Sequence, residues 1–479
     1  MIAIVSILRP RLLQRLVCLS LLTAPLVGIA AKKEEFITFQ FPAVALTHVE
    51  LIDGSGNAVQ ADMTILIRNG RIEAVGKTGE LAVPPDTPIK DLSGHSLTPG
   101  LVLMHEHIFY PTANGAYGAM FDSFPKLYLA GGATTIRTAG SISPYADINL
   151  KQDIASGEAI GPDIEVSAPF LNGNTPFVMQ MSRLATPEQA REMVAYWSAA
   201  GADSFKAYMH LTRPQLRAIV EEAHKHGKKV TGHLCAVGYH EAIDLGIDNI
   251  EHGFFAMTDV APDKVSDQCP SGDGTLRMLN TQSLDSSQIG ATILKLVRRK
   301  VALTSTLGVF ESFASGRPQA PKGALDLLIP ELRQQYLIRW NALANQPDNL
   351  WSQLLPKGMA WEKRFHDAGG LLMAGSDPTG YGGVIPGYSS LRQLELLQEA
   401  GFSLPQVVRI ASLNGATYLG RADEIGSIAP GKRADMVLFK GSLSKDPKAL
   451  QQLVWTMKAG VAYDRAKILA AYQGKIGLQ

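Results

Sequence analysis

Apolar runs of strand length alternate with helix-like segments through the middle of the sequence. Residues 213–226 and 389–400 are two of the helix-like segments. The strand-like runs begin near Leu101, Thr134, Ile164, Ser204, Lys229, Asn249, Ala302 and Leu371. Alternating strands and helices build a parallel sheet, and eight such units fit an α/β fold of the (β/α)8 TIM barrel type over residues 98–421. An open doubly wound sheet is the alternative, although no Gly-x-Gly-x-x-Gly turn follows the first run.

Both flanks of this central block are patterned as short β-strands instead. The candidate strands cover residues 44–51, 63–68, 71–75, 435–439 and 454–457. Because they lie at opposite ends of the sequence, we predict that residues 43–97 and 422–465 join into one small β-sandwich domain.

Two long segments, residues 254–286 and 307–370, follow strand-like runs of the predicted barrel. Loops after barrel strands surround the active site, so these segments are expected near it. The second segment carries the large apolar residues Phe310, Phe313, Trp340, Trp351 and Trp361. They predict a lid or a subunit contact in a homo-oligomer, and ordinary core packing is the alternative.

The amino terminus has a different character. Arg9, Arg11 and Arg15 precede an apolar stretch over residues 16–30, which ends in small residues and is shorter than the roughly 20 residues of a membrane-spanning helix. Residues 1–30 therefore predict a signal peptide and export to a periplasm or the medium. A retained membrane anchor is the alternative, and Cys18 lacks the small preceding residues of a lipoprotein site.

Composition narrows the class of protein. The chain has 479 residues, 46% of them hydrophobic, with 45 basic and 44 acidic side chains, as expected for a large globular enzyme. A net charge of +1 without long runs of like charge gives no support for nucleic acid as a partner. Cys235 and Cys269 remain after the signal peptide and are predicted to form a disulfide in an oxidising compartment. Two buried thiols are the alternative, and a metal-ligand role for Cys235 is a more distant one.

Histidines and one aspartate gather at the ends of the strand-like runs. His105 and His107 close the first run and project from one face, because side chains alternate along a strand. Barrel strands present their carboxyl ends at one mouth, where these side chains would converge. The converging residues are His105, His107, Lys206, His233, His252 and Asp377. Imidazole and carboxylate are ligands that zinc prefers, so the pattern predicts a metal site.

The same motifs carry a family resemblance. His-x-His after Pro99-Gly100-Leu101, the lysine, and the Glu251-His252-Gly253 and Gly375-Ser376-Asp377 motifs together resemble the amidohydrolase superfamily. The likeness is to its binuclear type with a carboxylated lysine, as in imidazolonepropionase-like and prolidase-like members. It implies that carbon dioxide carboxylates Lys206, which then bridges two divalent metal ions, with zinc expected. An ordinary lysine beside a single metal is the alternative.

The resemblance also assigns roles. His105, His107 and Asp377 would hold the buried metal, whereas His233 and His252 would hold the more exposed one. Metal lowers the pKa of bound water until hydroxide is available near neutral pH, and Asp377 would move its proton to the leaving nitrogen. Donors to the oxyanion are expected among Tyr208, His210 and Tyr110.

These features predict an exported amidohydrolase that cleaves a carbon–nitrogen bond in an amide, a dipeptide, an N-acyl amino acid or a lactam. A lactone or ester hydrolase, or a metal-dependent binding protein without catalysis, is the alternative. Apolar residues after the first and third strands predict a largely apolar pocket: Phe109, Tyr110, Tyr117, Phe121, Phe170, Phe177, Met179 and Met181. Arg137 and Arg183 are candidates to bind a substrate carboxylate, with structural salt bridges as the alternative.

Overall fold

The computed structural model describes residues 34–175, 181–380 and 384–477. Contacts between Cα atoms group Phe36–Gln479 into one compact unit. No helix in these ranges has both the length and the apolar character of a membrane span. The predicted signal peptide, residues 1–30, lies outside the described residues.

Every strand predicted for the central block is present, and these strands pair in parallel. A three-stranded sheet has the order β11-β10-β7, and a seven-stranded sheet has the order β13-β12-β14-β15-β16-β17-β18. Their bounds are β7 (Leu101–Glu106), β10 (Ala133–Thr138), β11 (Asp163–Glu165), β12 (Leu171–Asn172), β13 (Ser182–Arg183), β14 (Ser204–Ala207), β15 (Lys229–Gly232), β16 (Asn249–Glu251), β17 (Ala302–Ser305) and β18 (Leu372–Ala374).

The two parallel sheets meet at both edges. An isolated bridge between Ser167 and Ser204 links the segment after β11 to β14. At the other edge, the backbone N–H groups of Ser376 and Asp377 donate to the His105 carbonyl at 3.2 and 3.0 Å. The structure therefore has a mixed α/β fold in which the end of β7 lies against the segment after β18.

Helices connect the parallel strands. The predicted helices over 213–226 and 389–400 are confirmed as α5 and α13. Thr212 caps α5 in a reciprocal capping box with Gln215, which satisfies backbone N–H groups that a helix start leaves free. The connecting helices are α2 (Ser123–Ala130), α3 (Pro144–Ala155), α4 (Pro187–Ala200), α5 (Arg213–Lys225), α6 (Tyr239–Asp244), α8 (Ser287–Arg299), α13 (Ser389–Glu399), α14 (Leu404–Ala411) and α15 (Leu413–Tyr418).

The two long segments fold mainly as additional helices. The first contains α7 (Gly272–Thr281) and a short turn, η1 (Thr258–Val260). The second contains α9 (Leu307–Glu311), α10 (Lys322–Leu327), α11 (Pro330–Ala344) and α12 (Leu350–Asp367). A short hairpin, β8 (Phe109–Pro111) and β9 (Tyr117–Ala119), follows β7 and was not anticipated from the sequence.

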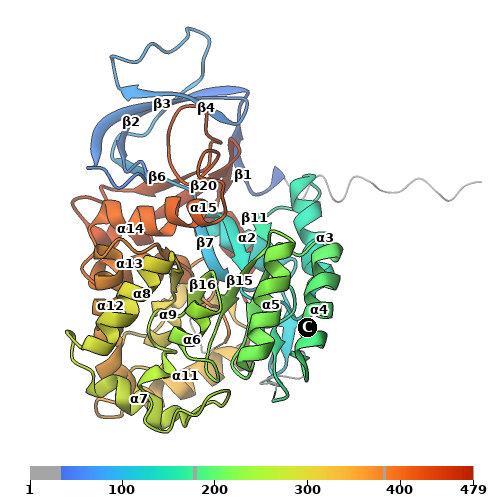
Figure 1. Cartoon of the computed structure of the whole chain (residues 1–479). Coiled ribbons are helices and arrows are strands. Elements are labelled where there is room, and N and C mark those ends of the chain that lie inside the picture. Colours follow the sequence, from blue (N-terminus) through green and yellow to red (C-terminus); the bar gives the residue numbers. More distant parts are fainter. Residues whose placement is uncertain (1–33, 176–180, 381–383, 478–479) are drawn as a thin grey trace, which may run out of the picture. The chain divides into compact units, whose positions relative to one another are not determined.

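Strands from both ends of the chain pair in one nine-stranded sheet, as the prediction of a shared β-region requires. Its central link is the antiparallel pairing of β6 with β19, in which Pro99 lies opposite Met436. In Figure 1, β20 accordingly lies close to β6 although the two are far apart in sequence. The strands are β1 (Ile37–Gln40), β2 (Ala43–Leu51), β3 (Gln60–Arg68), β4 (Arg71–Lys77), β5 (Ile89–Asp91), β6 (His95–Pro99), β19 (Met436–Lys440), β20 (Leu453–Lys458) and β21 (Val461–Asp464). The turn η2 (Pro447–Gln451) precedes β20, and α16 (Arg465–Ala471) follows β21.

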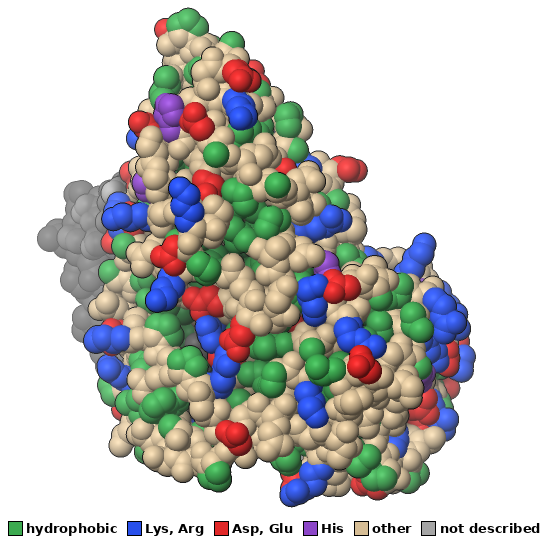
Figure 2. Space-filling model, turned by 90° about the vertical axis from the view of Figure 1, so that its left-hand side faces the viewer, with side chains coloured by type: hydrophobic (Ala, Val, Ile, Leu, Met, Phe, Trp, Pro, Cys, Tyr) green, Lys and Arg blue, Asp and Glu red, His purple; other side chains and the backbone are tan. Residues whose placement is uncertain are grey.

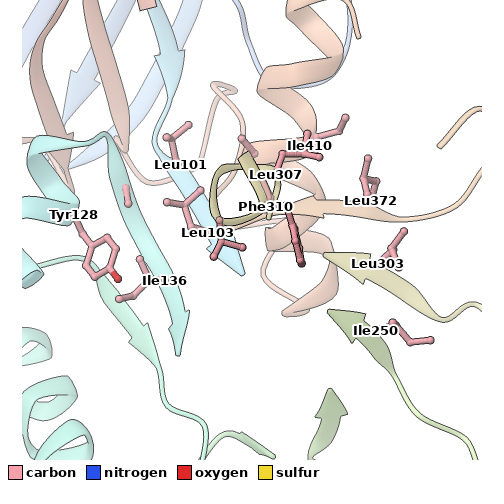
Figure 3. Close-up of a cluster of buried hydrophobic side chains, with 14 of the residues drawn as sticks. Leu101, Leu103, Tyr128, Ile136, Ile250, Leu303, Leu307, Phe310, Leu372 and Ile410 are labelled. Atoms are coloured by element: carbon pink, nitrogen blue, oxygen red, sulfur yellow. The ribbon is translucent and has the colours of Figure 1, made fainter. Parts of the chain in front are cut away.

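The largest apolar core joins the parallel strands to the helices around them. Leu103 on β7, Ile136 on β10 and Leu303 on β17 are fully buried. Figure 3 shows these side chains together with others from β16 and β18, gathered from strands distant in sequence. A separate apolar cluster, which includes Leu46 and Trp455, packs on the nine-stranded sheet. Basic and acidic side chains are interspersed on the face shown in Figure 2, consistent with the near-zero net charge.

Candidate metal centre

The six candidate ligands lie at carboxyl ends of parallel strands. Lys206 is on β14, and the other five end or directly follow β7, β15, β16 and β18. All six line one cavity of about 480 Å³, which brings together His105, His107, Lys206, His233, His252 and Asp377. We call this group the floor of the cavity.

Asp377 lies at the centre of the floor. Its Oδ1 atom is 3.2 Å from His107 Nε2 and 3.5 Å from His105 Nε2, and its Oδ2 atom is 3.8 Å from His252 Nδ1. Ligand atoms of His105, His252 and Asp377 all lie within 4.8 Å of one another. The His233 ring centroid is 4.4 Å from that of His252. The ligand atoms are therefore close enough for several of these side chains to bind the same metal ion.

Two floor residues have unusual backbone conformations. His252 and Asp377 have φ values of 69° and 52°, in the left-handed region that side chains other than glycine seldom adopt. The Asp377 N–H donates to the His105 carbonyl, and the N–H of the neighbouring Gly253 donates to Thr304, so main-chain bonds hold both positions. Such strain of about 1–3 kcal/mol per residue is typical of functional sites.

Glu251 lies outside the cavity lining and orients the floor residue His105, a role that the sequence did not reveal. It is fully buried, and its Oε2 accepts a hydrogen bond from His105 Nδ1 at 2.7 Å. Its other oxygen pairs with Arg137 and lies 3.6 Å from Lys206 Nζ. A carboxylate behind a histidine fixes the ring so that the opposite nitrogen faces the cavity. The signal available in the sequence was its place beside His252 at the end of the sixth strand-like run.

Lys206 is buried among the floor residues, with 1% of its surface exposed. Its Nζ atom has no hydrogen-bond partner among the described residues. Burial lowers the pKa of Lys206 to about 8, and Arg137 adds to this effect while Glu251 opposes it. Near neutral pH a larger fraction of this side chain than of an ordinary lysine is then an uncharged amine, the form that can react with carbon dioxide.

Three floor residues, His233, His252 and Asp377, have charge states that fit divalent metal ions, whereas at His105 burial is outweighed by the attraction of Glu251 and Asp377 together, which raises the pKa. Burial lowers the pKa of His233 to about 3 and that of His252 well below its usual value, so both imidazoles are neutral. Burial opposes ionisation of Asp377, but His105 and His107 hold its pKa well below the ordinary value. Neutral imidazoles and an ionised carboxylate are the forms that bind metal. His107 Nδ1 and Lys206 Nζ form no hydrogen bond among the described residues, which agrees with a site that binds metal.

A second buried glutamate holds the loop that carries Asp377. The Glu106 carboxyl accepts from the backbone N–H of Ser376 at 2.8 Å and from its hydroxyl at 2.6 Å. Burial raises the pKa of Glu106 to about 7, although these bonds favour the charged form. Glu106 therefore positions the segment next to Asp377 and lies outside the set of cavity-lining residues.

The three candidate oxyanion donors have different positions. Tyr208 lines the cavity, and its ring centroid is 4.9 Å from that of His233. His210 is half-buried beside Cys269, with 3.4 Å between its Nδ1 and the sulfur, and it is not among the cavity-lining residues. Tyr110 is buried against Phe124 and is also outside the lining. Tyr208 alone of the three reaches the cavity wall in this conformation.

Two groups of apolar side chains form the cavity walls. The first wall, from segments after β7, β11 and β14, comprises Phe109, Tyr117, Phe170, Met181 and Tyr208. The second wall, from the two long segments, comprises Phe255, Phe310, Phe313 and Trp351. The predicted apolar pocket is therefore present, and the second long segment forms part of it. Phe177 and Met179, two further candidates, lie outside the described residues.

The remaining aromatic residues of that segment pack elsewhere. Trp361 is fully buried in the core, and Trp340 lines a separate cavity of about 280 Å³.

Neither arginine proposed for a substrate carboxylate faces the cavity. Arg137 is buried and forms a salt bridge with Glu251, so the structural alternative is correct for this residue. Arg183, on β13, is exposed and is not part of the cavity lining.

Cys235 and Cys269 form a disulfide, as predicted, with 5.0 Å between their Cα atoms. Cys235 lines the cavity two residues after His233, and Cys269 precedes the start of α7. Pro270, Asp273 and Leu276, from Cys269 onward, also line the cavity. The disulfide therefore ties the segment that carries a floor histidine to the helix over the cavity.

Comparisons with known proteins agree with this architecture. A sequence model described as the Amidohydrolase family matches residues 96–465. Urease subunit alpha 2 of Brucella melitensis biotype 1 is 23% identical over 438 residues, which cover 85% of this chain and 67% of that protein. The crystal structure of a putative prolidase from Bifidobacterium longum is 26% identical and has a TM-score of 0.63, covering 88% of this chain and 95% of that one. Bottromycin amidohydrolase, at 18% identity and a TM-score of 0.67, covers 90% of this chain and 91% of its own, and shares the fold.

Proposed function

The chain belongs to the amidohydrolase family, a metal-dependent family of hydrolases that act on carbon–nitrogen bonds, and from this premise we propose that it cleaves the amide bond of a small molecule on the floor of the cavity. The observation that carries the proposal is the convergence of six candidate ligands in one cavity, with the Lys206 amine fully buried among them. His105, His107 and Asp377 would hold one divalent ion, His233 and His252 a second, and Lys206 would bridge them. Bound metal would supply Lewis acidity toward the carbonyl and an acidified water, with zinc as the expected ion.

We propose that Lys206 acts as a carbamate. Its uncharged amine would form a nitrogen–carbon bond with carbon dioxide and release one proton, leaving two carboxylate oxygens in place of an ammonium group. An ammonium has only donors and cannot bind a cation, whereas a carbamate can. The lowered pKa of Lys206 and its missing hydrogen-bond partner support this step.

Asp377 would transfer the proton. Its carboxylate would accept a proton from the attacking water and deliver it to the leaving nitrogen as the carbon–nitrogen bond breaks. Its ionised state and its central position in the floor support this role. Tyr208 would donate a hydrogen bond to the carbonyl oxygen as negative charge develops there. A donor role for His210 requires its side chain to move into the cavity.

The domain plan fits the same proposal. We infer that residues 98–421 form a (β/α)8 barrel, supported by the eight predicted strands among the ten of the two parallel sheets and by the contacts that link these sheets at two places. Residues 43–97 and 422–465 would form the accompanying β-sandwich domain, supported by their shared nine-stranded sheet. Export after removal of residues 1–30 is supported by the Cys235–Cys269 disulfide, because such bonds persist in oxidising compartments.

Metal removal tests the function directly. The purified protein, assayed for amine release from a panel of neutral amides, dipeptides, N-acyl amino acids and lactams, should hydrolyse at least one class. A chelator should abolish this activity, and added zinc or another divalent ion should restore it. Hydrolysis that persists in thoroughly metal-depleted protein, or absence of hydrolysis in metal-replete protein across the panel, would contradict the proposal.

A further inference from the structure

The two walls reach the floor at different histidines. The first wall adjoins His107, whose ring centroid is 4.5 Å from that of Phe109. The second wall adjoins His252, whose ring centroid is 5.8 Å from that of Phe310. A carbonyl held over the floor would therefore have apolar surface on both sides of its scissile bond.

The second wall is a continuous aromatic surface. Phe310 stacks on Phe255 at a centroid distance of 4.2 Å and on Trp351 at 5.4 Å, and Trp351 stacks on Phe313 at 5.4 Å. Phe310 lies on α9 and Trp351 on α12, Phe313 follows α9, and Phe255 belongs to the segment after β16, so the surface joins parts of the two long segments. A surface of this kind offers a large apolar or aromatic substituent more contact than a small one.

Positive charge is scarce around the cavity. Among the described lining residues, Asp273 is the one charged side chain besides the floor. Arg339 lies 5.2 Å from the Phe313 ring centroid, but it lines the separate cavity beside Trp340. A substrate carboxylate that entered the cavity would thus lose its hydration, and no basic side chain of the described walls would replace it. Burial of a charge without such a partner is unfavourable.

We propose that this cavity selects neutral amides with a bulky apolar group on each side of the scissile bond and rejects substrates that carry a carboxylate. The inference rests on the proposed amide hydrolysis and specifies its substrate class. It separates this chain from an enzyme for free dipeptides or N-acyl amino acids, whose substrates carry a carboxylate. Asp273 at the cavity rim adds to the rejection by repelling negative charge.

A matched series of substrates tests the proposal with the intact metal-loaded protein. N-phenethyl phenylacetamide carries a phenyl group on each side of the amide, and N-phenylacetyl phenylalanine adds only a carboxylate. N-phenethyl acetamide and N-ethyl phenylacetamide each lack one phenyl group. The two-sided neutral amide should have the highest kcat/KM, at least about tenfold above each single-phenyl amide, because each ring loses its burial when deleted. The carboxylate should lower kcat/KM by at least about tenfold.

Variants on the two walls locate the binding sites. Tyr117→Ala shortens the first wall and Phe313→Ala the second, at positions that are only partly buried. Each variant should reduce the advantage conferred by one of the two phenyl groups, and the two variants should affect different groups. Asp273→Asn should narrow the gap between the anionic and the neutral substrate by roughly threefold, as expected for removal of one nearby like charge.

Binding measurements separate this inference from the proposed function. Calorimetric titration of the Asp377→Asn protein with the same compounds should show tighter binding of the two-sided neutral amide than of the carboxylate. That preference without hydrolysis by the unaltered protein would overturn the amide-hydrolase function and leave the cavity preference supported. Faster hydrolysis or tighter binding of the carboxylate-bearing compound would overturn the inference and leave the function standing. Equal kcat/KM values and equal affinities for the single-phenyl and the two-phenyl amides would do the same.

Discussion

The floor and the walls of the cavity differ in how the chain builds them. Floor residues sit at or just beyond the ends of short parallel strands, and buried groups such as Glu251 and Glu106 orient them. Wall residues come largely from helices and loops inserted between the strands, and a disulfide ties α7, a further lining element, to the segment after His233. The floor is polar and buried, whereas the walls are aromatic. In the proposed function, reaction chemistry would depend mainly on the floor and substrate selection mainly on the walls, with Tyr208 of the first wall taking part in both. Most mutations of the floor and of the walls should therefore have separate effects.

The largest expected effect concerns the floor. Asp377→Asn removes the proposed proton acceptor and should lower kcat by about a hundredfold to ten-thousandfold, the usual contribution of general base catalysis. Steady-state kinetics on any hydrolysed amide measure this effect, and Asp348→Asn, an exposed aspartate, serves as the control. A catalytically inactive binding protein would instead retain its ligand affinity in this variant and show no turnover to lose.

Glu251→Gln tests the buried carboxylate that bonds to His105 and Arg137. The change leaves the buried Arg137 without a charged partner and should reduce the free energy of unfolding by about 3–5 kcal/mol. Loss of the bond to His105 should also weaken metal binding by roughly tenfold to a hundredfold. Denaturant unfolding and metal titration measure the two effects. Unchanged metal affinity in a folded variant would show that Glu251 does not orient His105.

Removing the disulfide tests how the lining helix α7 is attached to the segment that carries His233. Cys235→Ser with Cys269→Ser opens a connection between residues 34 apart in the sequence and should lower stability by about 2–4 kcal/mol. KM should rise more than kcat falls, because α7 contributes to the cavity lining and not to the floor. A reductant should shift the melting temperature of the unaltered protein toward that of the variant and leave the variant unaffected. Equal melting temperatures in all samples would contradict the attachment.

The smallest effect concerns Glu362, a buried glutamate on α12 behind the second wall. Burial raises its pKa from 4.5 to about 8, and its carboxyl bonds to the Ser305 hydroxyl at 2.6 Å. The unfolded chain ionises above pH 4.5, whereas the folded chain keeps the proton, so this group costs stability increasingly as the pH rises toward 8. Glu362→Gln imitates the protonated acid and should be more stable by about 1 kcal/mol at pH 8, with the gain shrinking toward pH 4.5. Melting temperatures across this pH range measure it, and a gain that grows toward acidic pH would contradict the assignment.

The floor could be predicted from the sequence because strand periodicity and residue type point to it together. Each ligand ends or follows an apolar run, and the runs at Leu101, Ser204 and Asn249 are confirmed as β7, β14 and β16. Glu251 was missed because a buried glutamate beside a histidine has no periodic signature. Its partners, Arg137 and His105, are more than 100 residues away in the sequence.

For the walls, the sequence predicted an apolar, aromatic lining but not which side chains face the cavity. Aromatic residues in residues 307–370 indicated a lid or a subunit contact, or else core packing. Trp351 lines the cavity, whereas Trp361 is packed in the core, and a lid or a subunit contact stays a prediction. Which ring faces the cavity depends on how α9 and α12 pack, and that is decided by long-range contacts. The pairing of β6 with β19 likewise joins segments that local patterns cannot align.

Metal content per subunit tests the central claim most directly. Elemental mass spectrometry on protein purified without chelator should give close to two equivalents, and Lys206→Ala should lower the value, whereas Lys445→Ala, at an exposed lysine, should not. That result would support a floor in which a modified Lys206 joins two ions. One equivalent that Lys206→Ala leaves unchanged would contradict the bridging role, and protein that binds no metal would contradict the proposed centre as a whole.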